Sequence, residues 1–359
     1  MKTKKLSEIS DIQYGYAFDS HYFTNDNKYP QLVRIRDIKR GFSETYYLGK
    51  YDEDYVVHYG DLLIGMDGNF NISRWKSEDA LLNQRVCKIA AKQDIIDEEY
   101  LQYALSRRLK HIEEKTAFVT VKHLSAKTLS NLKLEVPSQV EQIKIAQIIS
   151  KISKAINTKK DELRKLDELI KARFVEMFGD PISNNKSLSL KEFREICDLK
   201  AGDFTPAKQI FKVQDPINQY PCYGGNGIRG FVSNYTHDGK YVLIGRQGAL
   251  CGNVKLASGK FKNTEHAILV NPKIPINVFW LFELLDLEKL NRFKSGAAQP
   301  GLAVKTLNKI LIPNVDLECQ NEFANFVQQV DKSKFENIVY LNKMLLMKIL
   351  SQLGDVSRD

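Results

Sequence analysis

The sequence predicts a mixed α/β protein of the α+β class, with two pseudo-symmetric globular α/β domains and two long helices that form a coiled coil. Three observations lead to this prediction: a long internal repeat, a long helical stretch that closes each copy, and short β-branched and aliphatic runs at matching places. We expect the order globular, helical, globular, helical, with boundaries at 1–137, 138–181, 182–316 and 317–359.

The internal repeat is visible when the second half of the chain is aligned with the first at an offset of about 180 residues. Both copies open on a Glu-Ile-x-Asp segment that leads to a glycine, contain an aliphatic run into a Gly turn, and carry Gln and Ala at the head of the helical stretch. The aligned segments are 6–15 with 193–202, 62–68 with 242–248, 124–129 with 302–307, and Gln142 and Ala146 with Gln320 and Ala324. Several matches in one order indicate duplication, although two unrelated α/β pieces with similar turns are an alternative.

The length and composition indicate a globular protein of more than one domain. The chain has 359 residues, which exceeds the size at which a single core stops growing. No apolar run reaches the roughly 20 residues of a membrane-spanning helix, and residues 1–8 lack the apolar core of a signal peptide. We therefore expect a cytoplasmic protein with no membrane partner.

The cysteines and the positive charge bear on possible ligands. The 5 cysteines are scattered without a Cys-x-x-Cys pair, which argues against a disulfide framework and a zinc site, so we expect plain thiols and no bound metal. The net charge of +9 is compatible with binding phosphate backbones, because each Lys or Arg contact releases counterions. Many basic proteins bind no nucleic acid, however, so charge alone leaves the partner open.

The first long helix is predicted from Gln139 to Phe178. Residues at alternating steps of four and three follow the a/d rhythm of a coiled coil, and most of them are apolar. Gly179 and Pro181 then end the helix. The predicted seam positions are Ile145, Ile149, Ile152, Ile156, Lys159, Leu163, Leu166, Ile170, Arg173 and Met177.

The second long helix is predicted from Leu317 to Leu353, with less regular heptads. We expect the two seams to pack against one another, since each alone would expose an apolar stripe to water. The alternative is that each helix packs on its own globular domain. A helix of about 40 residues spans roughly 60 Å, so the pair is expected to form a rod. The apolar side of the second helix comprises Phe323, Val327, Val330, Ile338, Leu341, Leu345 and Ile349.

The two globular domains are predicted to contain short strands and matched short helices. Residues 55–65, 86–89 and 267–270 combine β-branched and aliphatic side chains, which favours buried strands. Residues 97–105 and 277–285 begin with Asp or Asn and continue with apolar residues, which is typical of a capped helix.

The loops between these matched elements differ between the two copies. They are rich in Arg, Lys, Asn, Gln and Tyr; Arg and Lys pair with guanine edges, and Asn and Gln pair with adenine. Different polar loops on a constant scaffold are what two different base sequences would require. The loops are 34–40, 69–75 and 83–85 in the first domain and 220–230, 245–248 and 264–266 in the second.

Each of these residues also has a purely structural alternative. Arg34, Arg36 and Arg74 could be solvated or paired with nearby carboxylates. The glycines of 224–227 could serve backbone geometry alone, and His266 could be a hydrogen-bonded core residue. The cluster therefore carries more weight than any single member.

No catalytic motif is found in the sequence. It contains no Gly-x-x-x-x-Gly-Lys-Ser/Thr phosphate loop, no His-Glu-x-x-His, no Gly-x-Ser-x-Gly and no Cys/His cluster with metal spacing. The Asn- or Asp-Pro-Pro-aromatic motif expected of an adenine methyltransferase is also missing, since Asp215-Pro216-Ile217-Asn218 matches it only in part. We therefore expect a non-enzyme with no catalytic residue.

The order of these motifs resembles the specificity subunit of type I restriction-modification systems over nearly the whole chain. The resemblance implies two target-recognition domains, each reading one half of a split DNA site, and two long antiparallel helices that also dock methyltransferase subunits. It implies a non-catalytic chain whose partners are double-stranded DNA, two methyltransferase subunits and restriction subunits. The motifs that carry it are the doubled Glu-Ile-x-Asp opening, 220–228, 245–248, 264–267, 307–313 and the Gln-led long helices.

The resemblance also places the chemistry on the partners. Adenine methylation would use S-adenosylmethionine held by the methyltransferase subunits, and cleavage would use ATP and Mg²⁺ in the restriction complex, so no cofactor is expected on this chain. Further recognition residues are expected just before the long helices, although the first copy has Val-Thr-Val at 119–121 where the second has a Gly/Ala/Gln/Pro run. The expected DNA-binding residues are Arg34, Arg36, Lys39, Arg40, Asn69, Asn71, Arg74, Gln84, Arg85, Lys122, His123, Tyr223, Asn226, Arg229, Arg246, Gln247, Glu265, His266, Gln299 and Lys305.

Two other functions are compatible with the sequence. One is a scaffold or helical adaptor that binds protein through its two domains; the salt dependence of DNA binding would separate it from a DNA reader. The other is an enzyme acting directly on nucleic acid, which would require activity from the isolated chain.

Overall fold

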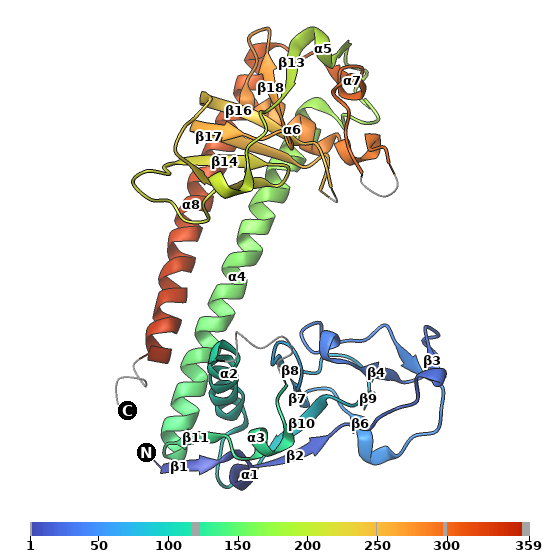
Figure 1. Cartoon of the computed structure of the whole chain (residues 1–359), viewed down its shortest axis with the longest axis vertical. Helices are drawn as coiled ribbons and strands as arrows, with labels where there is room; N and C mark the ends of the chain where they lie inside the picture. Colours follow the sequence, from blue (N-terminus) through green and yellow to red (C-terminus); the bar gives the residue numbers. More distant parts are fainter. Residues whose placement is uncertain (1, 116–122, 249, 297–299, 354–359) are drawn as a thin grey trace. The chain divides into compact units, whose positions relative to one another are not determined.

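The computed structural model describes residues 2–115, 123–248, 250–296 and 300–353. The chain divides into two compact units (Figure 1). The first unit holds residues up to 157 together with the end of the chain from 344, and the second unit holds residues 158–343. None of the described helices is long and apolar enough to cross a membrane.

The first unit is mixed α/β, with sheets of four, five and two strands in the orders β2-β10-β7-β8, β3-β5-β4-β9-β6 and β1-β11. Its strands are β1 (Lys2–Lys5), β2 (Ser10–Tyr14), β3 (Phe23–Thr24), β4 (Gln31–Val33), β5 (Tyr46–Tyr47), β6 (Val56–Val57), β7 (Leu62–Gly65), β8 (Ile72–Arg74), β9 (Ala80–Leu82), β10 (Val86–Ala91) and β11 (Lys133–Val136). Its helices are α1 (Leu6–Ile9), α2 (Glu98–Lys115) and α3 (Ala126–Ser130), with 3₁₀ turns at Ser20–Tyr22, Ile35–Asp37 and Glu53–Tyr55.

Strand β7 separates the hydrophobic clusters of the first unit. Leu62 and Ile64 pack into one cluster, while Leu63 between them packs into another. Successive side chains of a strand point to opposite faces, so a strand covered on both faces needs a continuous apolar run. This explains why Leu62, Leu63 and Ile64 are all apolar, whereas a strand with one face in water would alternate apolar and polar residues.

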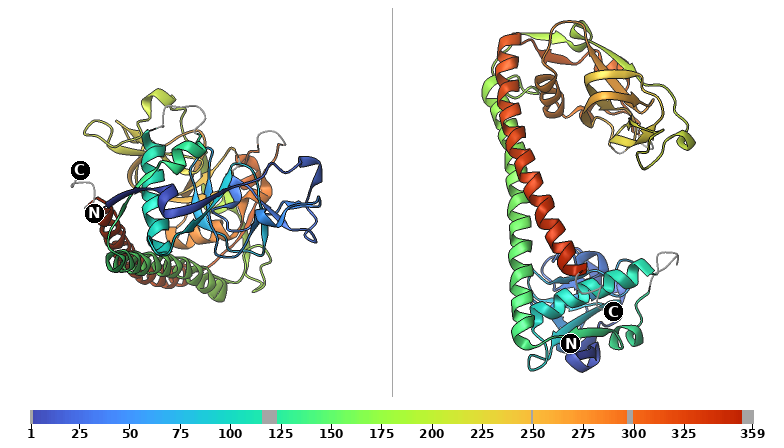
Figure 2. Two further views of the ribbon diagram at one scale, coloured as in Figure 1. Left: turned by 90° about the horizontal axis from the view of Figure 1, so that it is seen from below. Right: turned by 90° about the vertical axis from the view of Figure 1, so that its left-hand side faces the viewer.

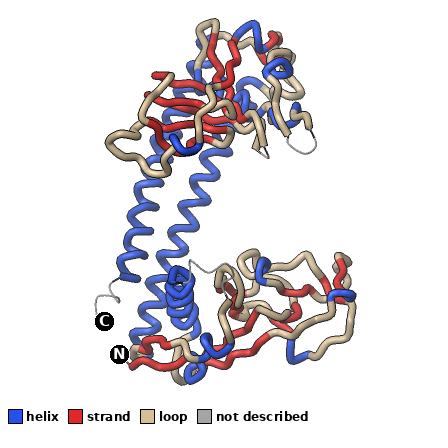
Figure 3. Tube along the Cα trace, in the orientation of Figure 1, coloured by secondary structure: helices blue, strands red, loops and turns tan. Residues whose placement is uncertain are grey.

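The second unit is built on one six-stranded sheet in the order β13-β18-β16-β17-β14-β15, with a two-stranded pair β12-β19. Its strands are β12 (Leu190–Glu192), β13 (Cys197–Ala201), β14 (Tyr220–Gly224), β15 (Gly227–Val232), β16 (His237–Gly245), β17 (Val254–Asn263), β18 (Ala267–Pro272) and β19 (Leu311–Pro313). Its short helices are α5 (Phe193–Ile196), α6 (Val278–Leu287) and α7 (Val304–Leu307), with 3₁₀ turns at Ala207–Gln209 and Leu290–Phe293. Figure 3 shows these strands and helices interleaved with long loops.

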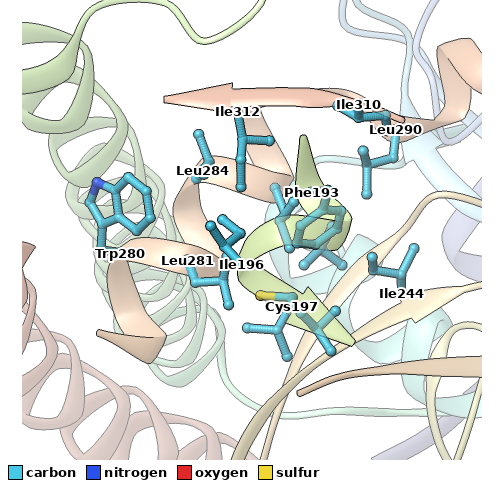
Figure 4. Close-up of a cluster of buried hydrophobic side chains, with 14 of the residues drawn as sticks. Phe193, Ile196, Cys197, Ile244, Trp280, Leu281, Leu284, Leu290, Ile310 and Ile312 are labelled. Atoms are coloured by element: carbon cyan, nitrogen blue, oxygen red, sulfur yellow. The ribbon is translucent and has the colours of Figure 1, made fainter. Parts of the chain in front are cut away.

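The core of the second unit joins the sheet to α5 and α6. Phe193 of α5, Ile244 of β16 and Leu284 of α6 are fully buried in one cluster, which Figure 4 draws in close-up. Trp280 belongs to the same cluster and is only 1% exposed. The apolar sequence of α6 is therefore explained by burial between the sheet and the long helices.

The duplication predicted from the sequence is confirmed by matching backbone hydrogen bonds. The amide of Gly15 donates to the carbonyl of Val86 at 3.0 Å, and Gly202 donates to Ala267 at 3.2 Å. A Cβ atom on Gly15 would lie 2.1 Å from the carbonyl oxygen of Asn83, and one on Gly202 would lie 2.1 Å from that of Asn263, so both copies require glycine here. The two units thus share a frame in which β2-β10-β7 corresponds to β13-β18-β16.

The aligned glutamines have one structural role in both copies. Gln142 is 1% exposed, and its side chain accepts from the amide of Asp97 at 2.7 Å and donates to the carbonyl of Pro137 at 3.0 Å. Gln320 accepts from Asn277 and donates to Val315, both at 2.8 Å. Each glutamine thus links the head of a long helix to the start of α2 or α6.

The long helices are α4 (Gln139–Phe178) and α8 (Leu317–Leu353), with the bounds that the sequence predicted. Within the second unit they run side by side in Figures 1 and 2 and are antiparallel. Arg173 contacts Glu322 at 3.0 Å, and Asp167 contacts Lys334 at 2.8 Å, so residue numbers rise along one helix as they fall along the other.

The predicted seam of α8 is wrong in part beyond Val330, because Leu341 is half-buried as expected but Ile338 and Leu345 are exposed. Ile338 is 44% exposed and Leu345 37% exposed, whereas Lys334 and Asn337 are half-buried at the following four- and three-residue steps. Lys159, a seam position of α4, donates to Asn337 at 3.1 Å. The seam therefore passes through polar residues, which an apolar pattern does not reveal, and a polar pair of this kind fixes helix register. Ile349 lies outside the side chains that the structure describes.

In the second unit the long helices pack against one another, as expected, and α4 also packs on the globular core of the second copy. Phe174 of α4 contacts Phe323 of α8 at 5.3 Å between ring centroids and Trp280 of α6 at 6.4 Å. The helices thus bury their apolar faces against one another and against the globular core at once.

Candidate nucleic-acid interface

The second unit carries an open cleft of about 510 Å³ formed by three of its loops. The turn between β14 and β15, the loop that follows β16 and the loop that precedes β18 all contribute to it. The cleft brings together four of the residues that the sequence suggested as DNA-binding: Asn226, Arg229, Gln247 and His266. Its other lining residues are Gly224, Gly225, Gly227, Ile228, Gly248 and Leu250.

The cleft offers both hydrogen-bonding and apolar surface. Asn226 accepts from the side chain of Asn253 at 2.7 Å, which orients its amide. Ile228 and Leu250 are each more than half exposed at the cleft, where they could contact a base or a thymine methyl group. His266 is half-exposed and lies 3.2 Å from Glu265, so it is a surface residue and not the core residue that the structural alternative proposed.

The glycines of the cleft serve backbone geometry. Gly227 has a φ of +97°, a left-handed conformation that side chains rarely adopt. A Cβ atom on Gly225 would lie 3.1 Å from the carbonyl oxygen of His266, so two of the cleft loops approach one another closely only without a side chain there.

The other suggested residues of the second unit lie differently. Tyr223 is 8% exposed and packs edge-on against Phe261 at 5.5 Å, so it is a core residue; burial raises the pKa of its hydroxyl. Arg246 is half-buried beside the cleft, and its amide donates to the carbonyl of His266 at 2.8 Å. Lys305 is exposed on α7, next to a separate hollow lined by Phe293 and Lys309.

In the first unit, two suggested residues converge on one carboxylate. Asp67, in the turn after β7, has a side chain that is 11% exposed and accepts hydrogen bonds from Arg85 and from Nδ1 of His123, the latter at 2.5 Å. Burial disfavours the charged carboxylate, but these two hydrogen bonds outweigh it and hold the pKa of Asp67 below its usual value. Gln84, beside Arg85, is exposed.

Asp67 was missed by the sequence reasoning. The sequence contains the signal, because Asp67 aligns in the repeated Gly turn with Gln247, which is one of the expected DNA-binding residues. The structure pairs both positions in the same way: Asp67 forms an isolated β-bridge with His123, and Gln247 forms one with Gly301.

Two arginines of the first unit have structural roles, as the alternative proposed. Arg34 bonds to Thr45 and lies 3.6 Å from Asp37, whose side chain is 1% exposed. Arg74 donates to Glu98 at 3.1 Å and to the carbonyl of Gly60 at 3.0 Å, and so links β8 to α2.

The remaining suggested residues of the first unit lie at or near the surface. Arg36 is 65% exposed, and Lys39 is exposed beside it. Arg40 forms an exposed ion pair with Glu44 at 3.4 Å, and Asn69 and Asn71 lie in the loop between β7 and β8. Lys122 and Gln299 lie outside the described residues.

Comparison with known families decides which group of proteins shares this doubled frame. The family described as type I restriction modification DNA specificity domain matches the chain twice, over residues 1–168 and 185–344. This chain belongs to that family. The two matched stretches each contain one copy of the repeat and most of one long helix.

Curated relatives and solved structures agree with this assignment. The EcoBI specificity subunit of Escherichia coli is 39% identical over 166 residues, and the EcoprrI specificity subunit of the same species is 45% identical over 128 residues. The EcoBI match covers 46% of this chain and 35% of the relative, and the EcoprrI match covers 35% of this chain and 32% of the relative. In these matches the chain spans about a third of the length of each relative. The MjaVIII specificity subunit of Methanocaldococcus jannaschii is 23% identical over 319 residues, which cover 78% of this chain and 74% of the relative.

The fold recurs in solved structures of low sequence identity. The type I restriction-modification S subunit from M. genitalium covers 98% of this chain and 94% of its own, with a TM-score of 0.60 and 16% identity. A chain from a study of the assembly of a type I restriction-modification system has a TM-score of 0.55 and 17% identity, with 98% and 95% coverage. At such identities the likeness concerns the fold.

Proposed function

We propose that this chain is the non-catalytic DNA-specificity subunit of a type I restriction-modification system, and that each of its two globular domains reads one half of a bipartite DNA target. The observation that carries the proposal is the repeated backbone frame with different polar side chains at equivalent positions. Asp67 and Arg85 in the first copy correspond to Gln247 and His266 in the second. A shared frame with divergent contacts suits two different base sequences.

The charge of the chain supports a nucleic-acid partner. The net charge of +9 would favour association with the phosphate backbone, while the polar loops would discriminate between sequences. The domains proposed for reading DNA are residues 1–137 and 182–316, with the helical segments 138–181 and 317–359 as connections.

The long helices support docking of partner subunits. Leu169, Phe335 and Val339 are 47%, 67% and 51% exposed on α4 and α8 of the second unit, away from the seam. Phe335 and Val339 lie four residues apart and share one face of α8, and methyltransferase subunits would cover this exposed apolar face. S-adenosylmethionine, and ATP and Mg²⁺ in the restriction complex, would belong to the partners, which carry out adenine methylation and cleavage.

The salt dependence of DNA binding tests this proposal against the scaffold alternative. The chain would be purified with its candidate methyltransferase subunits, and its affinity for DNA that contains candidate target sites would be measured at several salt concentrations. We expect log affinity to fall linearly with log salt concentration, with a slope of about −0.9 per phosphate contact. An intact complex that binds no DNA at low salt would support the scaffold function instead.

A further inference from the structure

The buried carboxylate of Asp67 organises two cationic or polar side chains at the surface of the first unit. Its side chain is 11% exposed, whereas those of Arg85 and His123 are 63% and 59% exposed. Both partners come from segments distant in sequence, the turn before β10 and the segment that leads to α3. The carboxylate is therefore fixed in the fold while its partners face outwards.

The backbone of Arg85 is also held in place. Its φ is +67°, a left-handed conformation that is uncommon for a residue with a side chain. Its carbonyl accepts the amide of Met66 at 2.8 Å, and the next amide, that of Val86, donates to Asn83 at 3.2 Å. With its backbone in a turn and its guanidinium on Asp67, Arg85 loses less conformational entropy on binding than an untethered surface arginine.

The Asp67–Arg85 pair of the first unit is equivalent in position to residues of the cleft in the second unit. The amide of Arg246 donates to the carbonyl of His266 at 2.8 Å, just as Met66 donates to Arg85, so Arg85 and His266 are equivalent in the frame. His266 and Gln247 line the cleft of the second unit. The Asp67–Arg85 pair therefore occupies the place at which the other copy presents its recognition loops.

The charge of the pair favours a base over a phosphate as its target. Asp67 compensates the charge of Arg85, which weakens the attraction for phosphate. A guanidinium has five N–H donors in a planar fork, so the contact with Asp67 leaves donors for a second planar acceptor. The O6 and N7 atoms of guanine form such an acceptor in the major groove.

We infer that Arg85 is a specificity-determining residue that reads a guanine in the half-site of the first domain, and that Asp67 is the positioning residue that aims it. This inference rests on the proposed function. It assigns one base type to one half-site. It also gives Arg85 a role in base recognition, whereas Arg34 and Arg74 make contacts that hold the fold together.

The test is methylation mapping of variants in a host that expresses the chain with its methyltransferase partner. Arg85→Gln should relax one position of one half-site, a guanine in the wild-type motif, with a loss of discrimination of about 5- to 150-fold. Asp67→Ala should relax the same position, and Asp67→Glu should recover part of the preference. The pair of Lys92 and Asp11, 3.6 Å apart just after β10, provides the control, since Lys92→Gln should leave the motif unchanged.

Arg85→Lys tests the geometry of the contact and covers the case in which Arg85→Gln loses all methylation. Lysine keeps the charge but not the planar fork, so it should still lower the preference for guanine. A lysine variant with the wild-type motif, a uniform fall of methylation at all sites with an unchanged motif, or a change in the other half-site would each overturn the inference. If the wild-type chain itself yields no split motif, the proposed function fails instead.

Discussion

The carboxyl group of Glu283 should make the stability of the second unit depend on pH near neutrality. Glu283 lies on α6, is 5% exposed, and has one carboxyl oxygen without a hydrogen-bond partner. Burial raises its pKa from 4.5 to about 7; Asp286 of α6 and Asp167 of α4 raise the pKa further, while Lys171 of α4 and Lys334 of α8 lower it. The folded unit therefore binds a proton that the unfolded chain releases between these two pH values.

The magnitude follows from the difference in pKa. A shift of about 2.5 units, at about 1.36 kcal/mol per unit, corresponds to about 3 kcal/mol. This stabilisation is fully present below pH 4.5 and is lost as the pH rises through about 7. Glu283→Gln removes the titrating group, so the variant should exceed the parent in free energy of unfolding at pH 8 by up to about 3 kcal/mol.

Urea denaturation between pH 5 and pH 8.5 would measure this difference. The chain has 2 tryptophans, so a Trp75→Phe background leaves Trp280, which lies in the same core as Glu283, as the reporter of the second unit. Glu318→Gln, at an exposed position of α8, is the control and should leave the pH dependence unchanged. An identical pH dependence in Glu283→Gln and its parent would refute the reasoning.

Three further predictions concern packing and modularity. Phe174→Ala should destabilise the second unit by about 3–5 kcal/mol in the same denaturation assay, since Phe174 is fully buried against Phe323 and Trp280; a loss below 1 kcal/mol would contradict this packing. Adding about four residues, one turn or roughly 6 Å, to both α4 and α8 should lengthen the spacer of the methylation motif by one or two base pairs at about 3.4 Å each; a fixed spacing with loss of all binding would count against a ruler. Exchanging residues 182–316 for another recognition domain should change one half-site in the methylation map, and loss of both would refute modularity.

The sequence predicted the long helices well because their signal is local. Helix α4 has an uninterrupted rhythm from Gln139 and a Gly stop after Phe178, and no tertiary contact is needed to recognise it. The seam of α8 was predicted less well, because Lys334 and Asn337 lie in it through contacts with Asp167 and Lys159 of α4, which only the fold supplies.

The sequence predicted several residues of the candidate site but not the contacts between them. Asn226, Gln247 and His266 were selected from three separate loops, and the fold brings them into one cleft. The alignment of Asp67 with Gln247 points to Asp67, but it does not reveal its partners His123 and Arg85, which only the fold places beside it. Pairings between distant loops depend on the tertiary fold, so a single sequence does not determine them.

Methylation mapping by long-read sequencing tests the central claim most directly. A host that carries this chain with its candidate methyltransferase partner would be compared with a host that carries the partner alone. The account predicts new adenine methylation at a split motif, with two short half-sites separated by an unspecified gap. No new methylation, with both proteins expressed and soluble, would contradict the account and favour the scaffold function.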